Sequence, residues 1–398
     1  MTVEIKPSKA KGQVKAPPSK SMAHRYLICA ALSEGVSKVH NVELSDDIKA
    51  TLNVISALGA TYTVSGSTVT INGVTDTPKD IRAYCQESGS TLRIMLPICL
   101  TFGNTTLSGE ECLFRRPLDE YSRLFKEAGF EYTQSETEVS VKGKLKSGIY
   151  KMRGDVSSQF ISGMLYALSM CKGISEIKLT TPLSSAPYVD MTISALRSFG
   201  AEIEVLENCY KIYPSKLLAK EITVEGDYSN AAFLHGFNYI GGEVDVAGLN
   251  ENSLQGDKVY LQHFEALKQG TPTISLGDCP DLAPVLFAVA AANNGGVFYD
   301  TERLKIKESD RGLAMKSELA KFSVKVEIEN NKITVGCGIK PPTAKICSHN
   351  DHRIVMATSL LCSMVGGKIE GSEAVSKSWP DYFNVIKALH IEANINDT

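Results

Sequence analysis

The chain has 398 residues, of which 43% are hydrophobic and 22% are charged, and its formal net charge is −3. These values are typical of a globular protein with a large core, and at roughly 150 residues per domain the length predicts two or three domains. The balanced charge argues against a protein that coats nucleic acid or an anionic membrane, because such proteins carry a basic surplus. No apolar run reaches the ~18–20 residues of a membrane span, and residues 1–14 lack the apolar segment of a signal peptide.

The ten cysteines are scattered singly along the chain, and none forms a C-x-x-C pair. Several lie inside apolar runs such as residues 27–30, which is typical of reduced core thiols rather than of a disulfide framework. The seven histidines show neither H-x-x-x-H nor H-E-x-x-H spacing. We therefore expect a cytoplasmic protein without a metal site.

The pattern that organises the chain is a unit that recurs six times. Each copy begins with an apolar helical run, reaches a glycine and continues into a β-branched strand, after which a second amphipathic helix leads to a strand pair. The glycines that end the apolar runs are Gly35, Gly103, Gly173, Gly242, Gly296 and Gly367. Their intervals of 68, 70, 69, 54 and 71 residues are too long for common solenoid repeats and too irregular for an open array. The sequence therefore predicts an α/β protein (α+β type) with two similar domains of three units each.

A polar or charged cluster stands at the beginning of the apolar helix in every copy. These clusters are residues 18–21, 87–91, 157–159, 227–230, Asp281 and residues 350–353. Ser, Asn and Asp are common N-cap residues, so helix capping alone would explain any one cluster. A helix N-terminus is also a site for anions, and Lys20, Arg25, Arg93 and Arg353 lie close to these positions. If the helix starts point to one cleft, we expect that cleft to bind an anionic ligand.

Residues 17–25, with the sequence P-P-S-K-S-M-A-H-R, resemble the opening motif of the 5-enolpyruvylshikimate-3-phosphate (EPSP) synthase family. Other segments that resemble this family follow in the same order, at residues 88–93, 116–117, 157–159, 185–188, 225–227, 280–281, 307–311, 350–353 and 377–380. The runs K-E-S-D-R at 307–311 and N-D-H-R at 350–353 are specific, whereas S-S-Q or R-P alone would be weak. The resemblance covers nearly the whole chain.

The resemblance implies an enolpyruvyl transferase-like inside-out barrel of two domains that close around an active site in the interdomain cleft. Transferred to this chain, the first three-unit domain spans residues 13–224, and the second spans residues 1–12 plus 225–398. The hinges are then expected near residues 11–14 and 224–226. This organisation agrees with the six copies found from the residues themselves.

The reaction implied by the resemblance moves the enolpyruvyl group of phosphoenolpyruvate to the 5-hydroxyl of shikimate 3-phosphate and releases phosphate. Addition is followed by elimination, so the site must hold two anions, a base for the hydroxyl and an acid for the methylene carbon. No redox step occurs, so we expect no cofactor, and Arg and Lys side chains replace a metal. The expected partners are these two substrates, with no nucleic acid and no membrane, and we expect a monomer.

The site residues implied by the resemblance fall into three sets. Phosphoenolpyruvate is expected to contact Lys20, Gly89, Arg116, Gln159, Arg311, Arg353 and Lys377. Shikimate 3-phosphate is expected to contact Lys20, Ser21, Arg25, Ser157, Ser158, Gln159, Ser185, Tyr188, Asp281 and Lys307. Asp281 is the expected base, Glu308 the expected acid and Lys20 the third candidate catalytic residue. From the residues alone, Asp281 also fits an N-cap, and Glu308 also fits an ion-pair partner of Lys307 or Arg311.

The sequence leaves two other functions open. The sister enzyme that transfers enolpyruvyl to UDP-N-acetylglucosamine uses a cysteine before its R-P pair, and Cys112 lies four residues before Arg116. The adjacent Glu110 and Glu111, however, disfavour a thiolate there. A non-catalytic repeat scaffold is the second alternative. The chain also departs from the family pattern at residues 87–90, where many members have N-A-G-T, and at Arg303, where some members have Asn.

Overall fold

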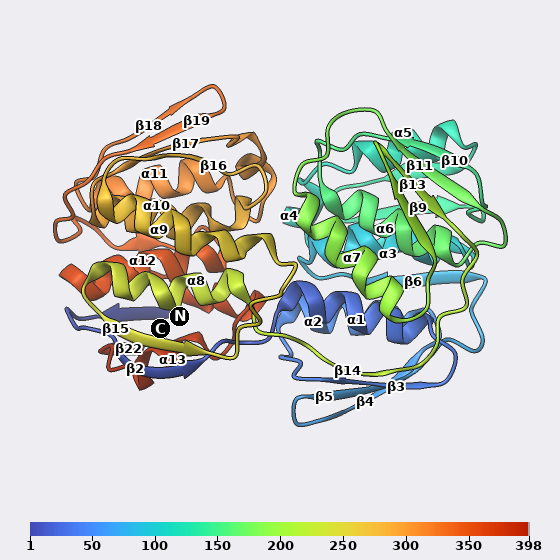
Figure 1. The fold of residues 1–398 in the computed structure, drawn as a ribbon, viewed down its shortest axis with the longest axis horizontal. Helices are drawn as coiled ribbons and strands as arrows, with labels where there is room; N and C mark the ends of the chain where they lie inside the picture. Colours follow the sequence, from blue (N-terminus) through green and yellow to red (C-terminus); the bar gives the residue numbers. More distant parts are fainter. Residues whose placement is uncertain (397–398) are drawn as a thin grey trace. The chain divides into compact units, whose positions relative to one another are not determined.

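The computed structural model describes residues 1–396, and the chain divides into two compact units. Unit 1 contains Met1–Ser19 and the chain from Gly226 onward, and unit 2 contains Lys20–Glu225. Each unit has its own hydrophobic core. The core of unit 2 is built from residues between Met22 and Val224. The core of unit 1 is built from Val3, Ile5 and Ala10 together with residues between Tyr228 and Ala393. Figure 1 shows the helices of each unit packed beside one another, with strands toward the outside.

Unit 2 contains three copies of a βαβαββ arrangement, of which the first takes its opening strand, β14, from the end of the unit. The first copy is α1 (Lys20–Leu32), β3 (Val36–His40), α2 (Asp46–Ala57), β4 (Thr61–Ser65) and β5 (Thr68–Asn72). The second is β6 (Asp80–Tyr84), α3 (Gly89–Leu100), β7 (Asn104–Ser108), α4 (Glu111–Phe114), α5 (Asp119–Glu127), β8 (Glu131–Gln134) and β9 (Glu138–Lys142). The third is β10 (Ile149–Met152), α6 (Ser158–Ser169), β11 (Ser175–Leu179), α7 (Ala186–Ser198), β12 (Ile203–Leu206) and β13 (Cys209–Ile212), and β14 (Glu221–Thr223) follows it.

Unit 1 repeats this arrangement with two changes. Its elements are β1 (Thr2–Ile5), β2 (Lys11–Lys15), α8 (Tyr228–Gly236), β15 (Glu243–Ala247), α9 (Tyr260–Gln269), β16 (Thr273–Ser275), α10 (Ala283–Ala292), β17 (Gly296–Tyr299), α11 (Arg311–Lys321), β18 (Val326–Glu329), β19 (Lys332–Val335), β20 (Ile346–Cys347), α12 (His352–Val365), β21 (Gly367–Glu370), α13 (Tyr382–Ala388) and β22 (Ala393–Asn396). Short 3-10 helices, η1 (Phe237–Ile240), η2 (Gly256–Val259), η3 (Pro280–Leu282), η4 (Glu302–Ile306) and η5 (Ser372–Lys377), lie between them.

The two changes explain the irregular spacing. In the fourth copy α9 leads directly into β16, so the described chain between these elements contains no hairpin, and the interval there is 54 residues instead of about 70. In the sixth copy β22 pairs with β1, so the N-terminal strand completes the last sheet. The prediction of six α/β copies, three in each unit, is therefore confirmed, with the fourth copy shortened.

The sheets share one topology, in which a parallel pair is followed by an antiparallel hairpin. The orders are β6-β7-β9-β8, β10-β11-β13-β12, β16-β17-β19-β18 and β20-β21-β1-β22. The remaining two exchange their opening strands: β14 pairs with β3 of the first copy, and β2 pairs with β15 of the fourth. Residues 13–19 therefore belong to unit 1, and its first boundary lies at residue 19 rather than at residue 12 as predicted. That the two connections act as hinges stays a prediction.

One buried amide fastens both connections inside unit 1. Gln255 is only 5% exposed, and its side-chain Nε2 donates to the carbonyl of Gly226 at 2.8 Å. Its Oε1 accepts from the Ser19 hydroxyl at 3.2 Å and from the Tyr228 N–H at 3.0 Å. Pro18 and Gly226 also form an antiparallel bridge. The chain therefore leaves and re-enters unit 1 at two points that are hydrogen-bonded to the same side chain.

The helices that open the copies form the centre of each core. In unit 1, α10 contacts α8 and α12, and every residue from Ala283 to Ala291 is buried. In unit 2, α3 packs along α6. These helices are buried on almost all sides, as is typical of helices that are apolar all round. Their polar and charged side chains therefore lie mainly in the first turns. Among the described residues, no helix combines the length and the apolar character that crossing a membrane requires.

Candidate active site

The expected site residues lie in two groups, one in each unit. In unit 2 they lie at the starts of α1, α3, α6 and α7 and just after α4. In unit 1 they lie at the starts of α11 and α12 and on η3 and η5. Side-chain caps by Ser88, Ser157, Asp227 and Asp351 confirm the predicted capping of α3, α6, α8 and α12.

The first two turns of α1 carry Lys20, Ser21 and Arg25. The Lys20 ammonium forms a 2.7 Å ion pair with Asp47 in the first turn of α2, and both side chains are about 15% exposed. Such a partly buried pair holds the lysine in one position while leaving it open to a ligand. Sequence reasoning missed Asp47, although the two adjacent acids at the start of α2 were a visible signal.

Arg25 is more deeply buried than expected of a phosphate ligand. Its residue is 4% exposed, and Nη1 and Nη2 each donate to a backbone carbonyl at 2.7 Å, those of Ser21 and Tyr188 respectively. Nε donates to Thr192 at 2.9 Å. Two of the five guanidinium N–H groups thus tie α1 to α7, one bonds back to Ser21 within α1, and two are left for other acceptors.

Gly89 and Arg116 approach each other closely at the first turn of α3. A Cβ placed on Gly89 would lie 2.7 Å from Arg116 Nη1, so any larger residue would push the guanidinium away. Arg116 Nε is buried and has no hydrogen-bond partner among residues 1–396. A buried donor of this kind is costly unless a ligand satisfies it, so this guanidinium is available to an anion.

Gln159 is fixed between the starts of α3 and α6. Its Oε1 accepts from Arg93 Nη1 at 3.0 Å, and its Nε2 donates to Ser90 Oγ at 2.8 Å. Arg93 is 5% exposed, lies over the ring of Phe160, and donates its other terminal nitrogen to the Pro117 carbonyl. Arg93 therefore holds Gln159 and the backbone at Pro117 in place. It was not among the predicted substrate contacts, although it lies in the segment that resembles the family.

The serines expected to hold a phosphate lie at two further helix starts in unit 2. Ser157 caps α6 by accepting from the Gln159 N–H, and Ser158 is the first residue of that helix. Ser185 precedes α7 in a left-handed conformation with φ 57°. This conformation is uncommon for a residue with a side chain, and strain of this kind concentrates at ligand-binding positions. Tyr188 lies in the first turn of α7, next to Arg25 through its carbonyl.

In unit 1 the guanidinium of Arg311 is surrounded by three carboxylates. Its Nε lies 2.9 Å from Asp351 Oδ2, Nη1 lies 2.7 Å from Asp281 Oδ1, and Nη2 lies 2.7 Å from Glu308 Oε2. The Arg311 and Asp351 side chains are 1% and 0% exposed, whereas Asp281 and Glu308 are each about 20% exposed. The alternative interpretation of Glu308 as a partner of Arg311 is therefore confirmed for this conformation.

Asp281 stands where three cations meet. Its carboxylate lies 3.0 Å from Lys307, 2.7 Å from Arg311 and 3.4 Å from Arg353. Burial alone would raise the pKa of this carboxyl, but Arg353, Lys307 and Arg311 outweigh burial and hold the pKa well below its usual range. The N-cap interpretation of Asp281 is wrong, since α10 is capped at Leu282 and the Asp281 side chain is used by these cations.

Three helix starts meet around Arg353. Its Nη1 donates to Ser229 Oγ at 2.6 Å and to the Asp281 carbonyl at 3.1 Å. Ser229 lies in the first turn of α8, Asp281 just before α10 and Arg353 in the first turn of α12. The expectation that helix starts converge is thus met within unit 1. Ser229 was missed as a contact, although the cluster at residues 227–230 contained it.

The neighbouring lysines differ in their surroundings. Lys377, on η5, donates to the Asn350 carbonyl at 2.7 Å. Burial lowers the pKa of Lys307, and the nearby cations Arg303 and Arg311 add to this effect against the attraction of Asp281. Arg303 is half-buried and donates to the Gly277 carbonyl at 3.4 Å. It therefore belongs to the charge cluster and does not simply face solvent.

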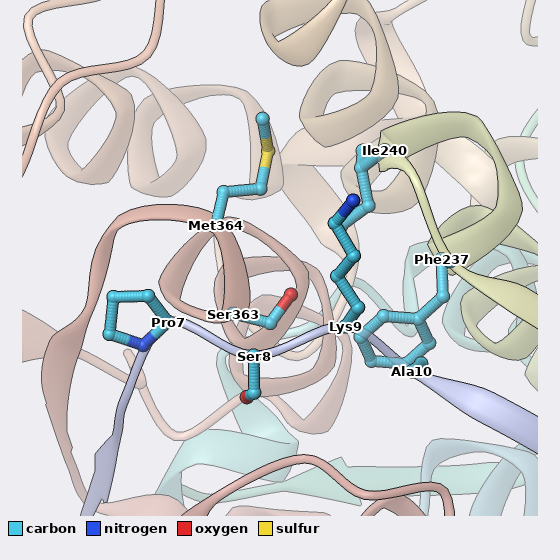
Figure 2. A pocket seen from close by; sticks show the side chains of 9 residues that line it. Pro7, Ser8, Lys9, Ala10, Phe237, Ile240, Ser363 and Met364 are labelled. Atoms are coloured by element: carbon cyan, nitrogen blue, oxygen red, sulfur yellow. The ribbon is translucent and has the colours of Figure 1, made fainter.

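A separate cavity of about 390 Å³ lies in unit 1 and has none of the expected site residues in its wall. Figure 2 shows it between the segment from Pro7 to Ala10 and the side chains of Ile240 and Met364. Among residues 1–396, Lys9 supplies the one charged side chain of its wall. The clusters around Arg116 and Arg311, by contrast, combine several charged groups with buried donors, and they are the better candidates for anion binding.

Comparisons with known proteins agree with this geometry. Residues 5–386 match the family model described as EPSP synthase (3-phosphoshikimate 1-carboxyvinyltransferase). A protein of that second name from Clostridium botulinum (strain Alaska E43) is 39% identical, over 98% of this chain and 97% of its own length. The one from Clostridium acetobutylicum is 40% identical over 97% of each chain.

Solved structures show the same fold. An EPSP synthase from Acinetobacter baumannii superimposes with a TM-score of 0.80 at 23% identity, covering 99% of this chain and all of its own. A second structure from the same organism gives 0.81 at 21% identity, with both chains covered fully. The two-domain mixed α/β fold expected from the sequence is therefore confirmed. By the extent of the family match and the identity to these relatives, the chain belongs to the EPSP synthase family.

Proposed function

We propose that this protein transfers the enolpyruvyl group of phosphoenolpyruvate to the 5-hydroxyl of shikimate 3-phosphate, as a 3-phosphoshikimate 1-carboxyvinyltransferase of aromatic amino-acid biosynthesis. The observation that carries the proposal is the Arg311 cluster, in which the candidate base Asp281 and the candidate acid Glu308 share one guanidinium. Family membership supports the reaction as a whole.

The proposed reaction balances without any co-reactant. The acceptor oxygen bonds to C2 of phosphoenolpyruvate while its proton passes to a base, and C3 gains a proton to become a methyl group. The tetrahedral intermediate then loses a C3 proton, the C2–O bond to phosphate breaks, and the new enol ether and inorganic phosphate leave. The protein must therefore move two protons and stabilise anionic oxygens.

In unit 2, Lys20, Gly89, Arg116 and Gln159 are the proposed contacts of phosphoenolpyruvate. The buried, unsatisfied Nε of Arg116 supports this role. We propose that the phosphate and hydroxyls of the acceptor contact Lys20, Ser21, Arg25, Ser157, Ser158, Gln159, Ser185 and Tyr188. For Arg25 only the two N–H groups that are not bonded to carbonyls or Thr192 are available.

In unit 1, Arg311, Arg353 and Lys377 are the proposed donor contacts, and Asp281 and Lys307 contact the acceptor. With its pKa held so low by three cations, Asp281 is a weak base in the ligand-free protein. Anionic ligands that engage those cations reduce the positive field at Asp281 and raise its basicity. In the same way, an anion at Arg311 competes with Glu308 and frees that carboxyl to take up and deliver the methylene proton.

The rival acceptor, UDP-N-acetylglucosamine, is less well supported. Cys112 lies on the one-turn helix α4, between Glu111 and Leu113, and Glu110 immediately precedes that helix. Adjacent carboxylates disfavour the thiolate that a cysteine mechanism needs. The test is phosphate release from phosphoenolpyruvate with each acceptor in turn. We expect turnover with shikimate 3-phosphate, and turnover with UDP-N-acetylglucosamine alone would overturn the proposal.

We further propose that the protein works as a monomer in the cytoplasm. All ten cysteines carry free thiols in the structure, and Cys29, Cys85, Cys99 and Cys362 are fully buried. Free thiols in this number suit a reducing compartment. Size-exclusion chromatography with light scattering should give a mass near 43.1 kDa, and a dimer mass would contradict the monomer.

A further inference from the structure

A buried polar chain crosses the core of unit 2 and ends at the candidate anion site. His24 Nδ1 lies 2.7 Å from Thr51 Oγ1, which lies 2.7 Å from Thr91 Oγ1. Thr91 Oγ1 donates to Ser88 Oγ at 2.8 Å, and Ser88 Oγ accepts the Thr91 N–H as the cap of α3. All four residues are at most 2% exposed. This chain of hydrogen bonds links α1, α2 and α3.

The chain has a direction that the surrounding atoms impose. The Thr91 hydroxyl faces two acceptors, Ser88 Oγ and, at 3.4 Å, the Asp47 carbonyl, so its proton points there. Thr91 Oγ1 must then accept from Thr51, and Thr51 in turn must accept from an Nδ1–H of His24. This assigns the proton of the neutral imidazole to Nδ1.

The environment of His24 agrees with that assignment. Its Nε2 is buried and has no hydrogen-bond partner among the described residues. A proton on Nε2 would leave an N–H buried without an acceptor, which is rarer in proteins than an unused acceptor. Burial, with Lys20 and Arg25 nearby, lowers the pKa of His24 to about 3 despite the opposing charge of Asp47, so the ring is neutral at physiological pH.

We propose that His24 is a positioning residue: its Nδ1–H directs the hydroxyls of Thr51, Thr91 and Ser88, and thereby fixes the first turn of α3, where Gly89 adjoins Arg116. The position of this turn matters because Arg116 lies against Gly89, where a Cβ would come within 2.7 Å of Arg116 Nη1, so a displaced turn would move the guanidinium. The Thr91 contact to Asp47 also joins the chain to the partner of Lys20. One network thus supports two of the proposed donor contacts.

Substitutions at His24 and Thr51 separate this role from plain core stability. Asn at 24 can place an amide N–H where Nδ1 stands, whereas Leu fills the space without a donor. Ser at 51 keeps the hydroxyl, whereas Val removes it and keeps the shape. Thr101→Val is the matched control, because Thr101 is a buried residue that directly follows α3 at the end opposite to Ser88, and its hydroxyl donates to the Ile98 carbonyl.

The kinetic test rests on the proposed function, so wild-type turnover with shikimate 3-phosphate is established first. We expect His24→Leu and Thr51→Val to raise KM for phosphoenolpyruvate about tenfold, the loss of roughly one aligned hydrogen bond, with kcat changed less. His24→Asn and Thr51→Ser should restore KM, and Thr101→Val should leave it unchanged. If Thr101→Val raises KM by the same factor, or if KM is as high in His24→Asn as in His24→Leu, the effect is general destabilisation and the proposal is wrong.

A second test is independent of catalysis. Nitrogen-15 spectra of the histidine side chains in the full-length protein distinguish the two neutral tautomers. We expect one ring to stay neutral as the Nδ1–H form down to about pH 4, and its signal to disappear in His24→Asn. An Nε2–H tautomer for that ring would overturn the proposal even if the proposed function holds.

Discussion

Arg311 Nε and Asp351 Oδ2 lie 2.9 Å apart, in side chains that are 1% and 0% exposed. Asp351 also accepts the Ser309 hydroxyl at 3.0 Å and caps α12 by accepting the Arg353 N–H at 2.9 Å. This one carboxylate therefore fixes two of the arginines that we propose for donor binding. It leaves the other two faces of the Arg311 guanidinium to Asp281 and Glu308, which are more exposed.

We predict that Asp351→Asn lowers the free energy of unfolding and also weakens the binding of phosphoenolpyruvate. Asn keeps the shape and the capping oxygen but removes the buried charge that faces Arg311, a change that typically costs about 3 kcal/mol or more. Urea unfolding of wild type and variant measures the loss. Glu327→Gln, which breaks an exposed pair with Lys325, is the control and should leave stability unchanged. Equal stability of Asp351→Asn and wild type would show that the pair contributes nothing.

Glu308→Gln and Asp281→Asn should lower turnover by at least ~100-fold, the usual contribution of a general acid or base. Neither carboxylate is needed to neutralise substrate charge, so phosphoenolpyruvate affinity in Glu308→Gln should be kept or improved. Calorimetry beside steady-state kinetics separates the two effects. Arg353→Ala is the contrast and should mainly weaken donor binding. Normal turnover of Glu308→Gln would leave the residue as an ion-pair partner of Arg311 only, and Lys20 would become the next candidate acid.

The sequence predicted the six copies because hydrophobic period, glycines and caps are local signals. It did not predict that β2 and β14 exchange places, since pairing with β15 and β3 joins segments about 200 residues apart and leaves no local mark. The first boundary was for that reason placed too early. Strand β1 shows no sign of belonging to the last sheet for the same reason.

Candidate site residues could be predicted where they lie in a motif that resembles the family. They were harder to predict where tertiary packing determines which groups a side chain contacts. Resemblance selected Arg311, Glu308 and Asp281, which the structure brings together. It did not select Asp47 or Ser229, because a short polar side chain at a helix start looks the same whether it caps the helix or contacts an arginine. The depth of Arg25 was equally hidden, since burial follows from the packing of α1 on α7.

Asp257 should make stability depend on pH in a direction opposite to that of most carboxylates. Burial, reinforced by Asp281, raises the pKa of this acid to about 6 from 3.8. The folded protein then holds a proton that the unfolded chain releases, so the stability from Asp257 is present below about pH 4 and is lost as the pH rises through 6. A shift of this size corresponds to roughly 3 kcal/mol.

Urea unfolding of Asp257→Asn and wild type from pH 4 to pH 8 tests this. Groups distant from Asp257 contribute equally to both proteins, and its neighbour Asp281 stays ionised over this range because its pKa is well below the usual value, so the difference between the curves isolates the titration of Asp257. We expect the variant to gain relative to wild type as the pH rises. Asp278→Asn, an exposed acid nearby, is the control and should follow wild type. Parallel curves for Asp257→Asn would mean that the carboxyl titrates normally.

Gln255 offers the last test, at the point where the chain leaves and re-enters unit 1. Gln255→Ala would leave the buried Tyr228 N–H and the Gly226 carbonyl without their partner, and each such group costs about 1–3 kcal/mol. Gln255→Glu keeps the acceptor for Tyr228 but turns a carboxylate oxygen toward the Gly226 carbonyl, so it should be at least as harmful at neutral pH. The exposed Gln262→Ala on α9 is the control and should be neutral, because alanine favours the helix. Differential scanning calorimetry should show lower melting temperatures for both Gln255 variants. If Gln255→Ala has the same melting temperature as Gln262→Ala, the two connections are held by the strand pairing of β2 with β15 and not by this amide.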